Sequence, residues 1–77
     1  MPAHISTPAD LGAALRAARR ARDLRLEDVA LAAGVGMRFL SELERGKPTA
    51  RLAETLRVAA ALGVDLVLED RGDRPSA

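Results

Sequence analysis

The chain has 77 residues, of which 48% are hydrophobic and 30% are charged, and its 12 basic and 11 acidic side chains leave a net charge of +1. This length allows one small domain, and the absence of Cys excludes disulfides and Cys-based metal sites, which suits a reducing cytoplasm. No apolar run approaches the ~20 residues of a membrane span and no secretory signal pattern begins the chain, so we expect a cytoplasmic protein with no membrane contact.

Residues 1–6 are expected to form a flexible leader before the first helix. Thr7 is a typical N-cap, Pro8 fits the first helical position, and Asp10 can complete a capping box. The helix is predicted to run to about Arg22, with an apolar stripe made of Leu11, Ala14, Leu15 and Ala18. Its second half begins a cluster of five arginines, which are typical either of a solvated face or of contact with a nucleic acid: Arg16, Arg19, Arg20, Arg22 and Arg25.

Two short helices that meet at Gly34 are the most informative feature of the sequence. They are predicted over about Leu26–Ala33 and Met37–Glu44, with Leu24 filling the core ahead of them. Gly34 can adopt the left-handed conformation that ends a helix and redirects the chain. Small or aliphatic residues occupy the positions where the two helices would touch, namely Val29, Ala30, Ala33, Val35, Leu40 and Leu43. This pattern is typical of a helix-turn-helix, whose second helix can lie in a DNA major groove.

A polar loop containing Gly46 and Pro48 separates this unit from a fourth predicted helix, which spans about Ala50 to Leu62. Its buried face is predicted to consist of Leu52, Leu56, Ala59 and Leu62. No repeat or low-complexity segment interrupts the chain, and Gly63 is expected to close the helix.

The segment Val64–Glu69 is short, rich in Val and Leu, and largely alternating, which predicts a β-strand. The chain offers no second strand, so its backbone groups would be satisfied by pairing with the same strand of a second copy across a two-fold axis. The alternatives are an extension of the fourth helix or a packed coil. The dimer interface would then consist of Val64, Leu66, Val67 and Leu68, and residues 71–77 are expected to be a disordered tail.

Enzyme activity is not expected. The single histidine, His4, lies in the leader, and the serines have no base partner in the sequence. Glu42 and Glu44 are two positions apart on a helix and therefore lie on different faces. There is no glycine-rich phosphate loop, no metal-ligand cluster and no sign of a cofactor, and the lone aromatic residue, Phe39, argues against a base-stacking platform.

The run LRLEDVALAAGVGMRFLSELERGKP resembles the helix-turn-helix of the Cro/repressor-like (XRE) family. With the following PTARLAETLRVAAALGVDLVLED it is most similar to the HipB-type antitoxins, whose domain ends in a strand. The resemblance covers about Leu11 to Glu69. It implies an all-α, lambda-repressor-like DNA-binding domain of four to five helices over residues 7–70, with one short C-terminal β-strand that pairs across a homodimer.

The resemblance also implies a function. A dimer of this kind would be a repressor that binds a palindromic operator in double-stranded DNA, with its recognition helices about one DNA turn, ~34 Å, apart. The more specific form is the autoregulating antitoxin of a HipBA-like toxin-antitoxin module, with a HipA-like kinase toxin as partner. The alternative is a protein-interaction module that keeps the fold but has lost DNA binding.

Roles follow by position from the same resemblance. The residues that match the base-reading positions are Met37, Arg38, Ser41 and Glu42. Arg38 could donate two hydrogen bonds to guanine and Glu42 could accept one from cytosine, although Glu42 could instead pair with a neighbouring Arg. Phosphate contacts are expected from Arg25, Arg45, Lys47, Thr49 and Arg51. Arg19 and Glu44 match a structural ion pair between the first and third helices.

Two positions depart from the family pattern. The family commonly has Gln at the start of the second helix, where this chain has Leu26, so one phosphate donor is lost. The recognition helix begins at Gly36, where the family usually has Ser or Thr as N-cap, and Gly caps a helix less well by a few tenths of a kcal/mol.

Overall fold

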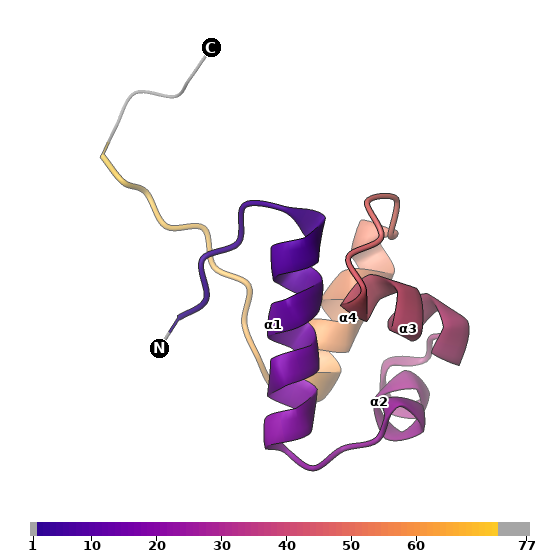
Figure 1. The fold of residues 1–77 in the computed structure, drawn as a ribbon. Helices are drawn as coiled ribbons and strands as arrows, with labels where there is room; N and C mark the ends of the chain where they lie inside the picture. The colour runs from indigo at the N-terminus through magenta and orange to yellow at the C-terminus, as the bar shows by residue number, and fades with distance from the viewer. Residues whose placement is uncertain (1, 73–77) are drawn as a thin grey trace.

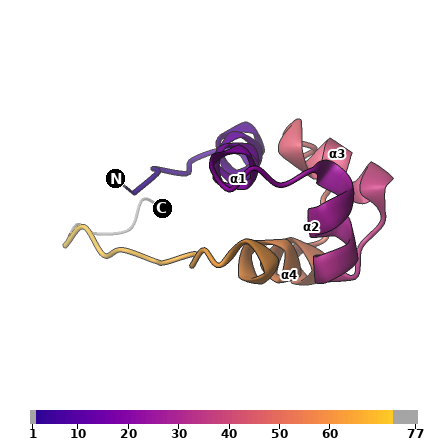
Figure 2. The ribbon, with the colours of Figure 1, turned by 90° about the horizontal axis from the view of Figure 1, so that it is seen from below.

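Four α-helices form the secondary structure of residues 2–72, the part of the chain that the computed structural model describes. They are α1 (Pro8–Ala21), α2 (Leu26–Ala33), α3 (Met37–Glu44) and α4 (Leu52–Leu62) (Figure 1). Seen from below, α2 and α3 lie at one end of the molecule, and both terminal segments extend from the other (Figure 2). None of these helices is long and apolar enough to cross a membrane. The predicted all-helical architecture is therefore confirmed for the described residues.

The predicted capping box starts α1. The Thr7 hydroxyl accepts a hydrogen bond from the Asp10 amide at 3.0 Å, and the Asp10 carboxylate accepts from the amides of Ser6 and Thr7 at 3.0 and 3.1 Å. These bonds, that from Ser6 foremost, hold the pKa of Asp10 below its usual value. Amides at the start of the helix that have no backbone acceptor are thereby hydrogen-bonded by the Thr7 and Asp10 side chains.

The core is built from small and aliphatic side chains of all four helices. Leu40 and Val58 are completely enclosed, and the buried set is Leu15, Val29, Ala30, Ala33, Leu40, Leu43, Val58, Ala59 and Leu62. The predicted contact residues of α2 and α3 all belong to it except Val35, which is half-buried and packs against its edge. Leu24 also packs there, as predicted.

The predicted buried face of α4 is partly wrong. Leu52 and Leu56 are 67% and 47% exposed, whereas Thr55 and Val58 take the inward positions. Apolar residues surround most of this helix, so hydrophobic spacing alone does not fix its rotation. Thr55 tolerates burial because its hydroxyl donates a 2.8 Å hydrogen bond to the carbonyl oxygen of Arg51, one turn back.

The predicted C-terminal strand is absent from the described residues. Gly63 ends α4 in the left-handed conformation with φ 71°, which rules out the longer helix, and residues 64–71 continue without regular structure. Val64 packs against the core of its own chain, whereas Leu66, Val67 and Leu68 are 43%, 78% and 101% exposed. A strand needs a partner to be defined by hydrogen bonds, and residues 2–72 offer none within one copy of the chain. Most of the predicted tail, residues 73–77, lies outside the described residues.

α1 crosses the end of α3 at Gly12 with the two backbones in direct contact. A Cβ atom at Gly12 would overlap the carbonyl oxygen of Leu43 and would lie 2.7 Å from that of Glu44. Backbone therefore packs directly on backbone, and only glycine fits this crossing. Sequence reasoning missed this role, although a glycine in a helix interior costs about 1 kcal/mol relative to alanine and usually has a packing reason.

We expect Gly12→Ala to lower the free energy of unfolding by about 1–3 kcal/mol, because the overlap with rigid backbone outweighs the gain in helix propensity. Urea denaturation monitored by circular dichroism would measure the change. Ala13→Ser is the control, since it adds one atom to the neighbouring, exposed position of the same helix and should cost about 0.5 kcal/mol. Equal stability of the Gly12→Ala variant and the original chain would contradict the close contact.

Candidate nucleic-acid interface

A tight turn at Gly34 joins α2 to α3 and sets the direction of the second helix. Gly34 has φ 69° and ψ 36°, and its amide donates to the carbonyl oxygens of Ala30 and Leu31. The Val35 amide also donates to the Ala30 oxygen, at 3.0 Å. This is the left-handed helix ending predicted from the sequence. The next helix begins at Met37, and its N-cap residue is Gly36, whose backbone is extended and which offers no side-chain cap.

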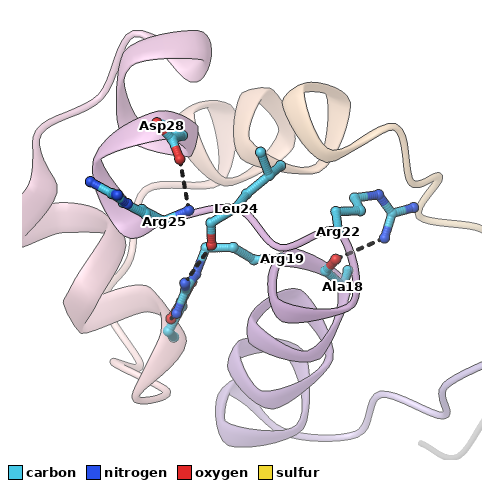
Figure 3. Close-up of polar contacts among 7 residues, drawn as sticks. Ala18, Arg19, Arg22, Leu24, Arg25 and Asp28 are labelled. Atoms are coloured by element: carbon cyan, nitrogen blue, oxygen red, sulfur yellow. Dashed lines mark hydrogen bonds and ion pairs between the residues drawn. The ribbon is translucent and has the colours of Figure 1, made fainter.

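Arg19 fixes the position of α3 against α1. Its Nε donates to Glu44 Oε2 at 2.7 Å and its Nη2 donates to Glu44 Oε1 at 3.0 Å, which is a two-pronged ion pair. Its Nη1 donates to the Leu24 carbonyl oxygen at 2.9 Å (Figure 3). The two side chains are only 15% and 7% exposed, and the hydrogen bond that Arg19 donates to Glu44 raises the pKa of Arg19. The predicted ion pair is present, so Arg19 belongs to the scaffold.

The side chains predicted to read bases line the outer face of α3 to different degrees. Arg38 is the most accessible, with 91% of its side chain exposed, and Met37 is 49% exposed. Ser41 is half-buried, and the Glu42 side chain is 26% exposed. The structure therefore brings all four to one helix, with the two N-terminal residues presented most openly.

Glu42 is engaged by two cations within the protein. Its carboxylate lies 3.3 Å from Lys47 Nζ and 3.8 Å from Arg38 Nε, and its carbonyl oxygen accepts from the Lys47 amide at 3.0 Å. A carboxylate held in this way is already compensated and offers less to an approaching base. The arrangement favours the pairing alternative for Glu42 over a role as a cytosine acceptor.

Four of the five predicted phosphate-binding residues lie around the α3–α4 loop, and the fifth, Arg25, precedes α2. Arg45, Lys47 and Thr49 are exposed there. Arg51 is more constrained, because its guanidinium stacks 5.6 Å from the centre of the Phe39 ring and pairs with Glu54. The hydrogen bond from Arg51 lowers the pKa of Glu54. A shallow hollow beside α3 is lined by Arg38, Phe39, Glu42, Lys47, Thr49, Ala50 and Arg51.

The start of α2 explains one departure from the family pattern. Leu26 is half-buried and packs against the core, so this position supports the fold. The helix is capped instead by Asp28, whose carboxylate accepts from the Arg25 amide at 2.8 Å (Figure 3). The Arg25 side chain is 80% exposed and lies 3.3 Å from Glu27. The chain thus keeps a cation, Arg25, near the start of this helix. The Gln that the family commonly has at the next position is replaced by Leu26, which makes an apolar contact instead of donating to a phosphate.

The rest of the arginine cluster divides by environment. Arg16 and Arg20 are exposed on α1, and Arg22 turns back to donate to the Ala18 carbonyl oxygen at 2.8 Å (Figure 3).

A further arginine that sequence reasoning missed is Arg57 of α4, which donates to the Ala33 and Gly34 carbonyl oxygens at 3.1 and 3.3 Å. Neither the spacing of residues nor the family resemblance pointed to this contact, which joins residues more than twenty positions apart.

Comparison with known proteins agrees with this geometry. A family model described as a helix-turn-helix domain matches residues 10–72. The chain belongs to the XRE-like helix-turn-helix family. It is 43% identical over 74 residues to the uncharacterized HTH-type transcriptional regulator y4mF of Sinorhizobium fredii, covering 96% of this chain and 97% of that protein. It is also 36% identical over 66 residues to the transcriptional regulator ClgR of Mycobacterium tuberculosis, covering 83% of this chain but 59% of that protein. This is a family of DNA-binding transcriptional regulators rather than of enzymes.

Solved structures extend the comparison to the fold. A structure titled HipB-O4 20mer complex superposes with a TM-score of 0.82 at 19% identity, covering 88% of this chain and 96% of that one. The clp gene regulator ClgR from C. glutamicum gives a TM-score of 0.70 at 35% identity and covers 80% of each chain. The chain therefore has a HipB-like fold, as its sequence predicted.

We expect Glu44→Arg to destabilise or unfold the domain, because it places two cations together where each side chain is largely excluded from water. Loss of one member of a buried pair typically costs about 3–5 kcal/mol, which is comparable to the whole stability of a small domain. Thermal unfolding followed by circular dichroism would measure it. The matched control is Glu27→Arg at a carboxylate that is 56% exposed, where we expect about 1 kcal/mol or less. Similar melting temperatures for the two variants would contradict a structural role for Glu44.

Proposed function

We propose that this chain is a sequence-specific transcriptional repressor that acts as a homodimer on a palindromic operator. The observation that carries the proposal is the outer face of α3, where Arg38 presents a side chain that is 91% exposed at the start of an exposed recognition helix. An arginine in this position can donate two parallel hydrogen bonds to guanine O6 and N7 in the major groove. Met37 beside it suits an apolar contact with a thymine methyl group.

Phosphate contacts position such a helix without specifying sequence. Arg45 and Lys47 follow α3 directly, and Arg25 precedes α2, so the cations flank the helix-turn-helix at both ends. Thr49 and Arg51 extend the set, although Arg51 must keep or exchange its contacts with Phe39 and Glu54. Binding through these side chains would release counterions and weaken steeply as salt rises.

Dimerisation is supported by the exposed apolar segment after α4. Leu66, Val67 and Leu68 project from it with little cover. The segment also borders an open groove of about 800 Å³, whose floor includes Ala14 and Ala18 of α1 and whose lining includes Val64, Val67 and Leu68. A second copy that pairs its own residues 64–69 with this segment satisfies the backbone groups of both and covers the apolar side chains.

The more specific role we propose is that of an autoregulating antitoxin. Its support is the HipB-like fold together with a solved HipA-HipB-O2-O3 complex, whose HipB chain covers 88% of this one at a TM-score of 0.82. In that role the dimer would bind both its own operator and a HipA-like kinase toxin. The rival role is a protein-interaction module without DNA binding, and the compensation of Glu42 by Lys47 and Arg38 is the observation that favours it.

DNA binding is tested by gel shift against the duplex upstream of the chain's own gene and a scrambled duplex of equal length. We expect the chain to prefer the first, and Arg38→Ala to reduce that preference by about 1–3 kcal/mol, or roughly 5- to 150-fold, through loss of guanine readout. Arg16→Ala is the control: it removes an exposed arginine of α1 and should leave the ratio of the two affinities unchanged. Absence of a shift at low salt would refute DNA binding and leave the interaction-module role.

Dimerisation is tested by measuring the molar mass of the protein by light scattering as it elutes from a size-exclusion column. We expect a mass twice that of the 8.1 kDa chain, and a single-chain mass for Leu66→Lys combined with Leu68→Lys, because two buried charges would face each other across the axis. Leu31→Lys, at a side chain that is 86% exposed on α2, should leave the mass unchanged. A double variant that remains dimeric would place the interface elsewhere.

A further inference from the structure

The carboxyl end of α2, at the α2–α3 turn, lacks the basic side chain that commonly stabilises the end of a helix. The carboxyl end of a helix carries a partial negative charge and unpaired carbonyl oxygens, and a basic residue in the last turn commonly compensates both. In α2 the last turn contains no basic residue, and its final residues are alanine and glycine. The amides of Gly34 and Val35 serve the carbonyl oxygens of Ala30 and Leu31, but those nearer the turn need another donor.

Arg57 supplies that donor from a different helix. Its Nε lies 3.1 Å from the Ala33 carbonyl oxygen and its Nη2 lies 3.3 Å from that of Gly34. One guanidinium therefore spans two successive carbonyl groups, which a planar fork can do and a single ammonium cannot. α2 and α4 pack side by side (Figure 2). The hydrogen bonds of Arg57 therefore join the middle of α4 to the turn that ends α2.

We propose that Arg57 is a positioning residue for the recognition helix. Its two hydrogen bonds hold the one turn whose backbone decides the direction of α3, and they anchor this turn to α4. The turn has little side-chain support at its glycines, because beyond the chain neighbours no atom lies within 4 Å of where a Cβ would stand at Gly34 or Gly36, and α3 begins without a side-chain cap. Arg57 replaces that missing local support with a cross-helix anchor.

The proposal gives Arg57 a role distinct from that of the exposed arginines. With two of its nitrogens committed to carbonyl oxygens, Arg57 acts on DNA through Met37 and Arg38, which follow the turn. Its consequence for DNA rests on the proposed function, but its effect on the turn does not. A residue of this kind affects specificity more than the electrostatic part of binding, because a helix that is free to tilt still meets phosphates while it loses its alignment with base edges.

The first test is amide hydrogen exchange in the free protein, which needs no DNA. We expect Arg57→Ala to speed exchange of the Val35 amide by about tenfold or more, while amides in the middle of α1 exchange as before, because the opening is local. Arg57→Lys keeps the charge but can reach only one carbonyl group at a time, and it should give an intermediate rate. A uniform increase across α1 and the turn would show a general structural role and overturn the proposal, as would an unchanged Val35 rate.

The second test uses the two duplexes described above over a range of salt concentrations. We expect Arg57→Ala to lower the preference for the upstream duplex at least fivefold with an unchanged slope of log K against log salt. A loss of equal size on both duplexes, with a slope reduced by about one, would make Arg57 a phosphate contact instead and overturn the proposal. If the original chain binds neither duplex, the proposed function fails, and the exchange experiment still decides the role of Arg57.

Discussion

The position of α3, the second helix of the helix-turn-helix, depends on the guanidinium of Arg19. Its three nitrogens reach Glu44 at the end of α3 and the carbonyl oxygen of Leu24 before α2, so one side chain of α1 holds both halves of the helix-turn-helix. The core beneath it consists of alanine, valine and leucine side chains, whose contacts are not directional. A charged pair that is nearly excluded from water tolerates few alternative geometries, because any displacement leaves a charge without its partner. It therefore specifies the arrangement that hydrophobic contacts only favour.

The fold was predictable from the sequence wherever local chemistry decides the structure. Thr7, Pro8 and Asp10 determine where α1 begins, and Gly34 determines where α2 ends, because each acts on its own backbone. The rotation of α4 was not predictable, because Leu52 and Leu56 form as good a stripe as the residues that are actually buried. Their exposure follows from how α4 packs against α2 and α1, and that packing is a property of the assembled domain.

The candidate site divides in the same way. Arg38, Lys47 and the Arg19–Glu44 pair follow from position in a known pattern, and the structure gives their surroundings. The contact of Arg57 with the turn joins residues that are 23 and 24 positions apart, so no spacing rule could predict it. The pairing of the Glu42 carboxylate with Lys47 depends on the path of the loop after α3. Helix and turn propensities do not determine that path. The sequence thus predicts which charged residues could contact DNA. The packing of the chain decides which of them are already paired within the protein.

The glycine crossing at Gly12 has a consequence for how such a domain can change. α3 is held by its backbone against α1 and by Leu40 and Leu43 against the core. Its outer side chains therefore contribute little to the stability of the fold. Met37 and Arg38 can be exchanged one at a time without disturbing the scaffold. The eight residues of this helix therefore combine a rigid inner face with an outer face that is free to evolve. Under the proposed DNA-binding role, a lineage built on this chain can diverge in binding preference through single substitutions while its architecture stays constant.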